Sequence, residues 1–282
     1  MYQEISQLLM YGDLEEDSIL AQMGELFGKY ETGEYNKTGL VRDINTQVKR
    51  ILKVATDYGF DDNLWHNYLT FFLMMSENPF SMTCEKVGAS DGSVNALVEN
   101  DFRIFKALFD YDFGPIEKDL GIHCFSQISN YKAIHKKDLM YNKNVSEKVR
   151  SLSKKLEAAK DEKEFFDAVT GFYKDYGVGM FGLNKAFRID DTPQGSFTFR
   201  AINNMDTVML DDLIGYELQK KKLVENTQAF CDGKAANNVL LFGDSGTGKS
   251  TSIKAIVNEY YDQGLRMIEI YKHQFKDLST VI

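Results

Sequence analysis

The chain has little cysteine and little proline, and it lacks a long apolar run. Its 282 residues include three cysteines and three prolines. A sparse, odd set of cysteines without C-x-x-C spacing argues against a disulfide framework and against a zinc site. The longest apolar stretch, L-T-F-F-L-M-M at 69–75, is much shorter than the about 20 residues that cross a bilayer. We therefore predict a cytoplasmic protein with reduced thiols and no membrane association.

Basic residues are also in the minority. The chain holds 33 Lys and Arg against 42 Asp and Glu, which gives a formal net charge of −9. Domains that coat nucleic acid usually carry a basic face, so nucleic acid is not indicated as a partner. The N-terminal segment M-Y-Q-E-I-S-Q has no basic region of the kind that opens a secretory signal peptide.

The scarcity of proline suits long helices, and the first part of the chain has helical periodicity. Apolar residues recur at steps of three and four between 40 and 55, which is typical of one buried helix face. Gly59 stands where the C-terminal cap of this helix belongs. Asp161 and Glu164 fit a capping box at the start of another helix. We predict a helical N-terminal domain over 1–176.

The pattern changes at Gly177. The glycines of G-V-G-M-F-G at 177–182 predict a turn, because no strand precedes them as a dinucleotide-binding motif would require. Apolar residues then alternate with polar ones at 197–201, which is the period of a β-strand. With a turn at 192–195, two short strands would form a hairpin. We predict a glycine turn and β-hairpin linker over 177–205.

The segment 206–282 predicts a different kind of structure. A helix at 216–230 precedes an apolar strand at 239–242, and a helix from 249 leads to a second strand at 265–270. This order is the opening βαβ unit of a parallel sheet. The expected fold class is therefore a mainly α N-terminal domain followed by the first βαβ part of a parallel-sheet α/β P-loop domain.

The loop between that strand and helix carries the strongest motif. G-D-S-G-T-G-K-S at 243–250, the P-loop, matches the phosphate-binding pattern G-x-x-x-x-G-K-S. Its glycines let successive backbone N–H groups point at an anion. We expect ATP and Mg²⁺ as cofactors, with Lys249 as the catalytic residue at the β- and γ-phosphates and the Ser250 hydroxyl as a Mg²⁺ ligand. The predicted phosphate-binding residues are Gly243, Asp244, Ser245, Gly246, Thr247, Gly248, Lys249, Ser250 and Thr251.

Together with L-D-D-L-I-G-Y-E at 210–217, this motif resembles the AAA+ ATPases. In that family an apolar–glycine element ahead of the first helix packs against adenine, which implies adenine contacts at Leu213, Ile214 and Gly215. Over about residues 200–282 the chain looks like a bacterial branch known as domain of unknown function 815. An alternative interpretation is an ordinary helix start, with Asp211 or Asp212 as cap and Ile214 in the core.

The resemblance implies a homo-oligomeric enzyme that hydrolyses ATP and remodels a protein partner. In AAA+ proteins a later strand carries paired acids that hold Mg²⁺, and the sequence ends at Ile282 before such a strand. We therefore expect an N-terminal fragment of a longer AAA+ protein, which binds ATP without hydrolysing it. The apolar strands at 239–242 and 265–270 would then lack neighbours to cover them.

Two other hypotheses stay open. A P-loop kinase or GTPase would share the P-loop, although no N/T-K-x-D guanine motif occurs in the sequence. Alternatively, the helical domain is a protein-interaction module, and the nucleotide site is vestigial or incomplete.

Overall fold

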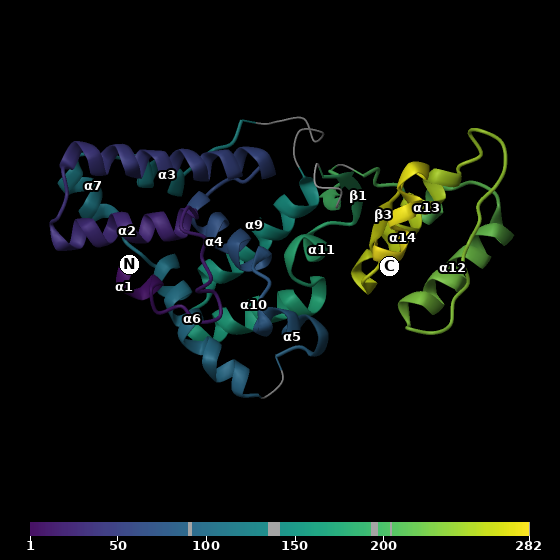
Figure 1. Cartoon of the computed structure of the whole chain (residues 1–282), viewed down its shortest axis with the longest axis horizontal. Helices are drawn as coiled ribbons and strands as arrows, with labels where there is room; N and C mark the ends of the chain where they lie inside the picture. Colours follow the sequence, from purple (N-terminus) through teal and green to yellow (C-terminus); the bar gives the residue numbers. More distant parts are fainter. Residues whose placement is uncertain (90–91, 135–141, 193–196, 204, 282) are drawn as a thin grey trace. The chain divides into compact units, whose positions relative to one another are not determined.

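The computed structural model describes residues 1–89, 92–134, 142–192, 197–203 and 205–281, which form two compact units (Figure 1). The first unit is Met1–Leu183 and the second is Asn184–Ile282. The described chain is mainly helical and has a small mixed sheet of three strands. None of the helices in these ranges combines the length and the hydropathy that a membrane crossing requires.

The first unit is built from α-helices, as the periodicity predicted. Their bounds, in chain order, are α1 Tyr2–Ile5, α2 Ile19–Thr32, α3 Lys37–Tyr58, α4 Leu64–Met75, α5 Pro79–Val87, α6 Ser93–Phe109, α7 Gly114–Leu120, α8 Cys124–Ser129, α9 Lys143–Ala158, α10 Glu162–Tyr176 and α11 Gly179–Leu183. Gly59 caps α3 in a left-handed conformation, with φ of 70° and its N–H donated to the Ala55 carbonyl. At α10, Asp161 accepts the Glu164 N–H, but the Glu164 carboxylate reaches back to the Lys160 N–H.

The core of this unit surrounds α4, which contains the apolar run found in the sequence. Its apolar residues are not confined to one face, and nine of its twelve residues are buried. A helix that is apolar on all sides needs neighbours on all sides. It packs against α3, α6, α8, α9 and α11.

A buried carboxylate fixes the N-terminal segment in the same unit. Asp101 on α6 is fully buried and accepts the backbone N–H groups of Leu9, Met10 and Tyr11 at distances of 2.7–3.1 Å. Because buried charges are stable only when they are hydrogen-bonded, the segment and the carboxylate stabilise each other.

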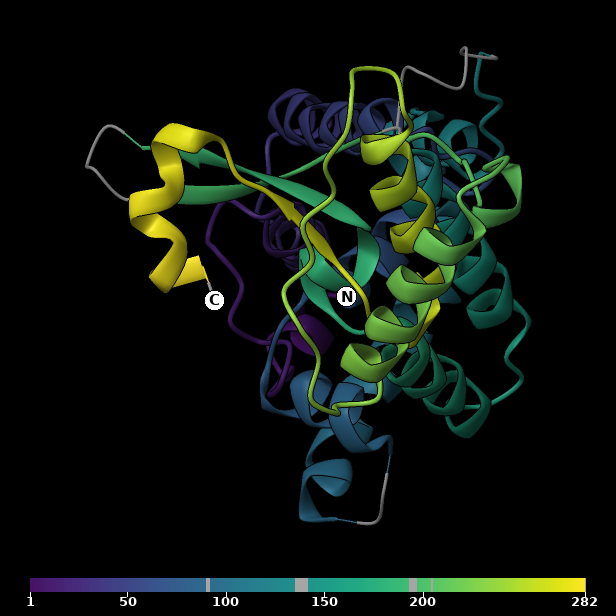
Figure 2. The same ribbon diagram turned by 90° about the vertical axis from the view of Figure 1, so that its right-hand side faces the viewer.

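The second unit combines the sheet with two longer helices. Its elements are β1 Ala186–Asp191, β2 Phe197–Ala201, η1 Leu210–Asp212, α12 Glu217–Cys231, α13 Lys249–Tyr260, η2 Tyr261–Gln263, β3 Met267–Glu269, η3 Lys272–Asp277 and α14 Leu278–Val281. The sheet order is β2-β1-β3, with β1 antiparallel to β2 and parallel to β3 (Figure 2). The predicted hairpin strands are therefore present, whereas the end of their predicted turn at 193–195 lies outside the described residues.

The structure does not show the predicted βαβ start of a P-loop α/β sheet. The segment 239–242 forms no strand, and Val239, Leu240 and Phe242 have exposed fractions of 50%, 83% and 86%. A strand needs a hydrogen-bonded neighbour, and in the described sheet the order is β2-β1-β3 with no pairing to 239–242. The prediction of a buried strand was wrong: Val239, Leu240 and Phe242 are exposed, and Leu241 is half-buried.

Helix α13, which follows the P-loop, is held by hydrogen bonds from its last turn and by its buried face. The Asn258 amide donates to the carbonyls of Asp206 and Val208 at 2.8 and 2.9 Å. Ala255, Ile256, Val257 and Tyr260 are buried. These contacts fix the helix that begins at Lys249.

Candidate P-loop nucleotide site

The backbone of the P-loop requires two of its glycines. Gly246 and Gly248 have φ of 82° and 80°, in the left-handed region that residues with a side chain rarely adopt. No heavy atom lies within 4 Å of the position that a Cβ would take at either glycine. The glycines are therefore needed for the path of the backbone, and the space beside them is open.

The side chain of Lys249 folds back onto this loop. Its ammonium donates to the carbonyls of Gly243 at 2.9 Å and Asp244 at 2.6 Å, and to the Thr247 hydroxyl oxygen at 3.3 Å. The Thr247 hydroxyl in turn donates to the Asp244 carbonyl at 2.8 Å. These bonds hold the Lys249 ammonium, a positive charge, against the backbone of the P-loop.

Helix α13 starts directly after the loop and presents its N-terminus there. Gly248 is the N-cap residue, so no side chain caps the helix, and the first turn contains no acidic residue. Uncapped N–H groups and the positive end of the helix dipole favour an anion at this position. Ser250, which is exposed, and Thr251, which is half-buried, lie in this first turn.

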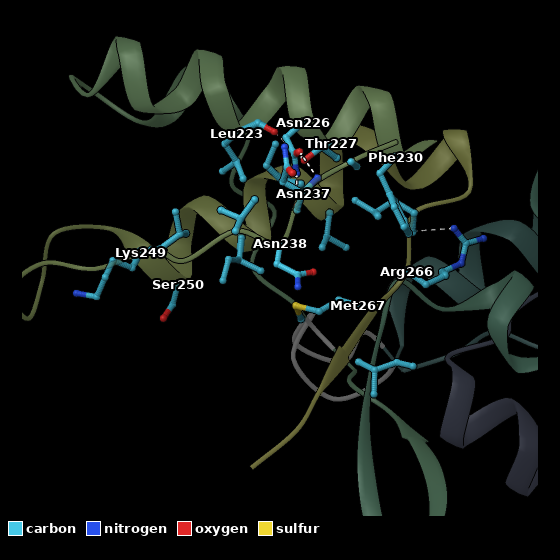
Figure 3. Close-up of a pocket in the computed structure, with 18 residues that line it drawn as sticks. Leu223, Asn226, Thr227, Phe230, Asn237, Asn238, Lys249, Ser250, Arg266 and Met267 are labelled. Carbon is cyan, nitrogen blue, oxygen red and sulfur yellow. Dashed lines mark hydrogen bonds between the residues drawn. The ribbon is translucent and has the colours of Figure 1, made fainter. Parts of the chain in front are cut away.

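A cavity of about 780 Å³ lies between α12, α13 and β3 (Figure 3). Lys249 and Ser250 border it at the start of α13, and Arg266 and Met267 border it at β3. On α12, the Asn226 amide donates to the Asn237 carbonyl and accepts the Asn237 N–H, both at 2.8 Å. Asn226 therefore holds the chain that leads to the P-loop.

A second cavity of about 310 Å³ also borders Lys249. It is lined by the start of α12, the segment 240–242 and the P-loop. Its lining residues are Tyr216, Gln219, Lys220, Leu223, Leu240, Leu241, Phe242, Gly243, Thr247, Lys249 and Ser252. Lys249 thus borders both cavities.

The three residues predicted to contact adenine are close in sequence to this smaller cavity, but they do not line either one. Ile214 is 94% exposed, so the alternative that placed it in the core is wrong. Leu213 is half-buried and its carbonyl accepts the Lys220 ammonium at 2.8 Å, while Gly215 has φ of 85°. The N-cap of α12 is Tyr216, and neither Asp211 nor Asp212 fills that position.

Few of the described side chains around the two cavities could serve as ligands of a metal ion. The Ser250 hydroxyl can serve as one Mg²⁺ ligand, but none of the described residues that line the two cavities is Asp or Glu. Across the described chain, no three His, Cys, Asp or Glu side chains gather in a metal-binding group.

Residues 183–282 match the model of a family described as Protein of unknown function (DUF815). The match covers about a third of the chain. It begins at the residue that ends the first unit, and the matched segment includes the hairpin, α12, the P-loop and β3. No curated protein and no solved structure matches the chain.

The sequence analysis did not identify Tyr216, Gln219 and Asn226, in the matched segment 183–282, as residues of the candidate site. The first two border the smaller cavity, and Asn226 holds the chain that leads to the P-loop. Helical spacing was the available signal, because positions 216, 219, 220 and 223 share one face of a helix. The P-loop motif alone does not indicate which face of the preceding helix lies beside it.

Proposed function

We propose that this chain binds ATP, with the triphosphate on the P-loop. The observation that carries the proposal is the position of Lys249: its ammonium lies against the glycine loop, at the uncapped start of α13. Backbone N–H groups, a helix N-terminus and a lysine together are the elements that bind phosphate in P-loop proteins.

The residues predicted to bind phosphate have the following roles in this proposal. The N–H groups of the loop from Gly243 to Gly248 cradle the phosphates, and Lys249 leaves its carbonyl partners to neutralise the β- and γ-phosphates. Ser250 holds Mg²⁺, which neutralises phosphate charge when it is bound. Thr251, one position further along α13, lies near the α-phosphate.

We propose that this chain binds ATP without hydrolysing it. Hydrolysis requires a group that orients water and a carboxylate that helps to hold Mg²⁺. No carboxylate occurs among the described residues around either cavity. The AAA+ resemblance extends the proposal to ATP hydrolysis in a homo-oligomer that remodels a protein partner, and that activity would need carboxylates from elsewhere.

A lysine substitution tests the proposal. We expect Lys249→Ala to weaken MgATP binding about 10- to 100-fold, because hydrogen bonds to charged groups contribute about 1.5–3 kcal/mol each. Isothermal titration calorimetry of the whole chain with MgATP measures the change.

The matched control is Lys221→Ala. Lys221 lies on α12, is exposed, pairs with Glu225 at 3.8 Å and lines neither cavity. This variant should bind MgATP like the wild type. Equal affinity of Lys249→Ala and the wild type would overturn the proposed site.

A further inference from the structure

The first unit has a groove between the N-terminal halves of α6 and α10. This α6–α10 groove encloses about 660 Å³, a volume typical of ligand sites. Asn95, Ala96, Glu99 and Phe102 line it from one face of α6, and α10 supplies the other wall. All of its described lining residues belong to the first unit, so the groove is distinct from the P-loop site in the second.

The floor of the groove is aromatic. Phe102 is buried and Phe166 of α10 is half-buried, and their ring centroids are 5.4 Å apart in an edge-to-face contact. Ala96 is exposed, and its small side chain leaves the space beside these rings open. Part of the Phe166 ring is therefore uncovered, and burying it against an apolar group of a ligand would be favourable.

The charged side chains around the groove leave a negative charge. Lys163 and Asp167 of α10 pair with each other at 2.6 Å. Glu99 of α6 and Glu162 of α10 are exposed, and neither carboxylate has a hydrogen bond or an ion pair with a residue that the structure describes. The two walls thus carry one unpaired carboxylate each, which repels phosphates and attracts a cation.

We propose that the α6–α10 groove docks a basic peptide segment of a partner protein, with an arginine side chain between Glu99 and Glu162. A guanidinium has five N–H donors, enough to serve both carboxylates, and it also stacks on aromatic rings such as Phe166. The methylene stem of arginine packs on apolar surface while its charged end pairs with the carboxylates. This docking does not depend on ATP binding.

The groove favours a peptide over a free small cation. Its volume of about 660 Å³ has room for the arginine together with a neighbouring side chain. The aromatic floor offers that neighbour an apolar contact, which a hydrated amine or metal ion would not use. The expected segment therefore has an arginine next to an apolar residue.

The test probes an array of random-sequence peptides with the whole chain and then measures the affinity of the best-bound peptide by fluorescence anisotropy. We expect the bound peptides to share an arginine beside an apolar residue. Glu99→Gln and Glu162→Gln should each weaken binding about 5-fold, because an exposed ion pair contributes up to about 1 kcal/mol. Replacing the arginine by citrulline, which is similar in shape but uncharged, should weaken binding at least as much.

Two further variants separate the groove from the rest of the surface. Ala96→Leu fills the groove without a change in charge and should abolish binding. Its control is Ala158→Leu, at the exposed end of α9. Glu147→Gln is the control for the carboxylates, because Glu147 is exposed on α9 and lies outside the groove. Both control variants should bind the peptide like the wild type.

Several outcomes would overturn the proposal. An array without bound peptides, or with bound peptides that share no basic residue, would do so. Unchanged affinity in Glu99→Gln and Glu162→Gln, or equal affinity for the citrulline peptide, would show that the carboxylates bind no arginine. Argininamide that binds as tightly as the peptide would assign the groove to a small cation. A wild-type dimer that Glu99→Gln dissociates, measured by light scattering, would make a second copy the occupant.

Discussion

His66 on α4 is a titratable side chain buried in the helical unit. Its Nε2 lies 2.8 Å from the Phe109 carbonyl, which identifies Nε2–H as the donor of the neutral ring, and the ring stacks on Phe109. Nδ1 is buried and has no hydrogen-bond partner among the described residues, and the Glu157 carboxylate is 3.9 Å away. Burial lowers the pKa of His66, against the opposing effects of the Phe109 carbonyl and the charges of Glu157 and Asp110.

This lowered pKa predicts a loss of stability in mild acid. The unfolded chain binds the proton near the ordinary pKa of about 6.5, whereas the folded chain binds it only at lower pH. The free energy of unfolding should therefore be highest above about pH 6.5 and fall as the pH drops toward the folded pKa. Urea unfolding of the helical unit, followed by circular dichroism between pH 8 and 5, measures this slope.

The matched variant is His66→Gln, which keeps an amide donor near Phe109 but does not titrate. We expect it to be less stable at pH 8 and to have a shallower slope below pH 6.5. A slope equal to that of the wild type would show that other groups cause the acid sensitivity.

At the residue scale, the P-loop motif indicates which residues lie together, while their binding of phosphate stays a prediction. The glycines and the lysine of the P-loop are brought together by a few consecutive residues, so their contacts follow from the motif. The surroundings of Ile214 depend on distant parts of the chain. Its 94% exposure, and the position of Gln219 beside the P-loop, could not be predicted from the sequence.

At the element scale, the segment that leads to the P-loop is held by a side chain instead of a sheet. Asn226 bonds both backbone groups of Asn237, and no strand forms at 239–242 (Figures 2 and 3). Local opening of this segment should therefore be controlled by Asn226.

Asn226→Ala should free that segment. The Asn237 N–H is donated to the Asn226 amide oxygen, and loss of this bond, with a net contribution of about 0.5–1.5 kcal/mol, should speed hydrogen exchange of the Asn237 amide by about 10-fold. Mass spectrometry of the exchanged peptides measures the rate. Glu225→Ala, which removes an exposed neighbouring side chain, is the control, and unchanged exchange in Asn226→Ala would contradict the prediction.

Helices were easier to predict than strands because their hydrogen bonds are local. The periodicity around 40–55 was sufficient to predict α3, including its glycine cap. A strand needs a partner that the local sequence does not name. Thus 239–242 has the apolar pattern of a buried strand but no neighbour, while β3 pairs with β1, about 80 residues earlier.

At the scale of the whole molecule, the two units differ in how they are stabilised. The large core cluster of buried apolar residues lies within 1–183 and is rich in aromatic contacts. The second unit has a small sheet, and large apolar side chains such as Leu240 and Phe242 are exposed in it. The pairing of β1 with β3 places the hairpin in this second unit, which a change in sequence pattern near 177 could not indicate.

Amide hydrogen exchange of the whole chain, with and without saturating MgATP, tests most directly whether the P-loop binds ATP. We expect slower exchange at 243–252 with MgATP, because the N–H groups of the P-loop and of the first turn of α13 would bind phosphate oxygens. Lys249→Ala should abolish this protection. Unchanged exchange at 243–252, or protection confined to 1–183, would show that the P-loop does not bind ATP.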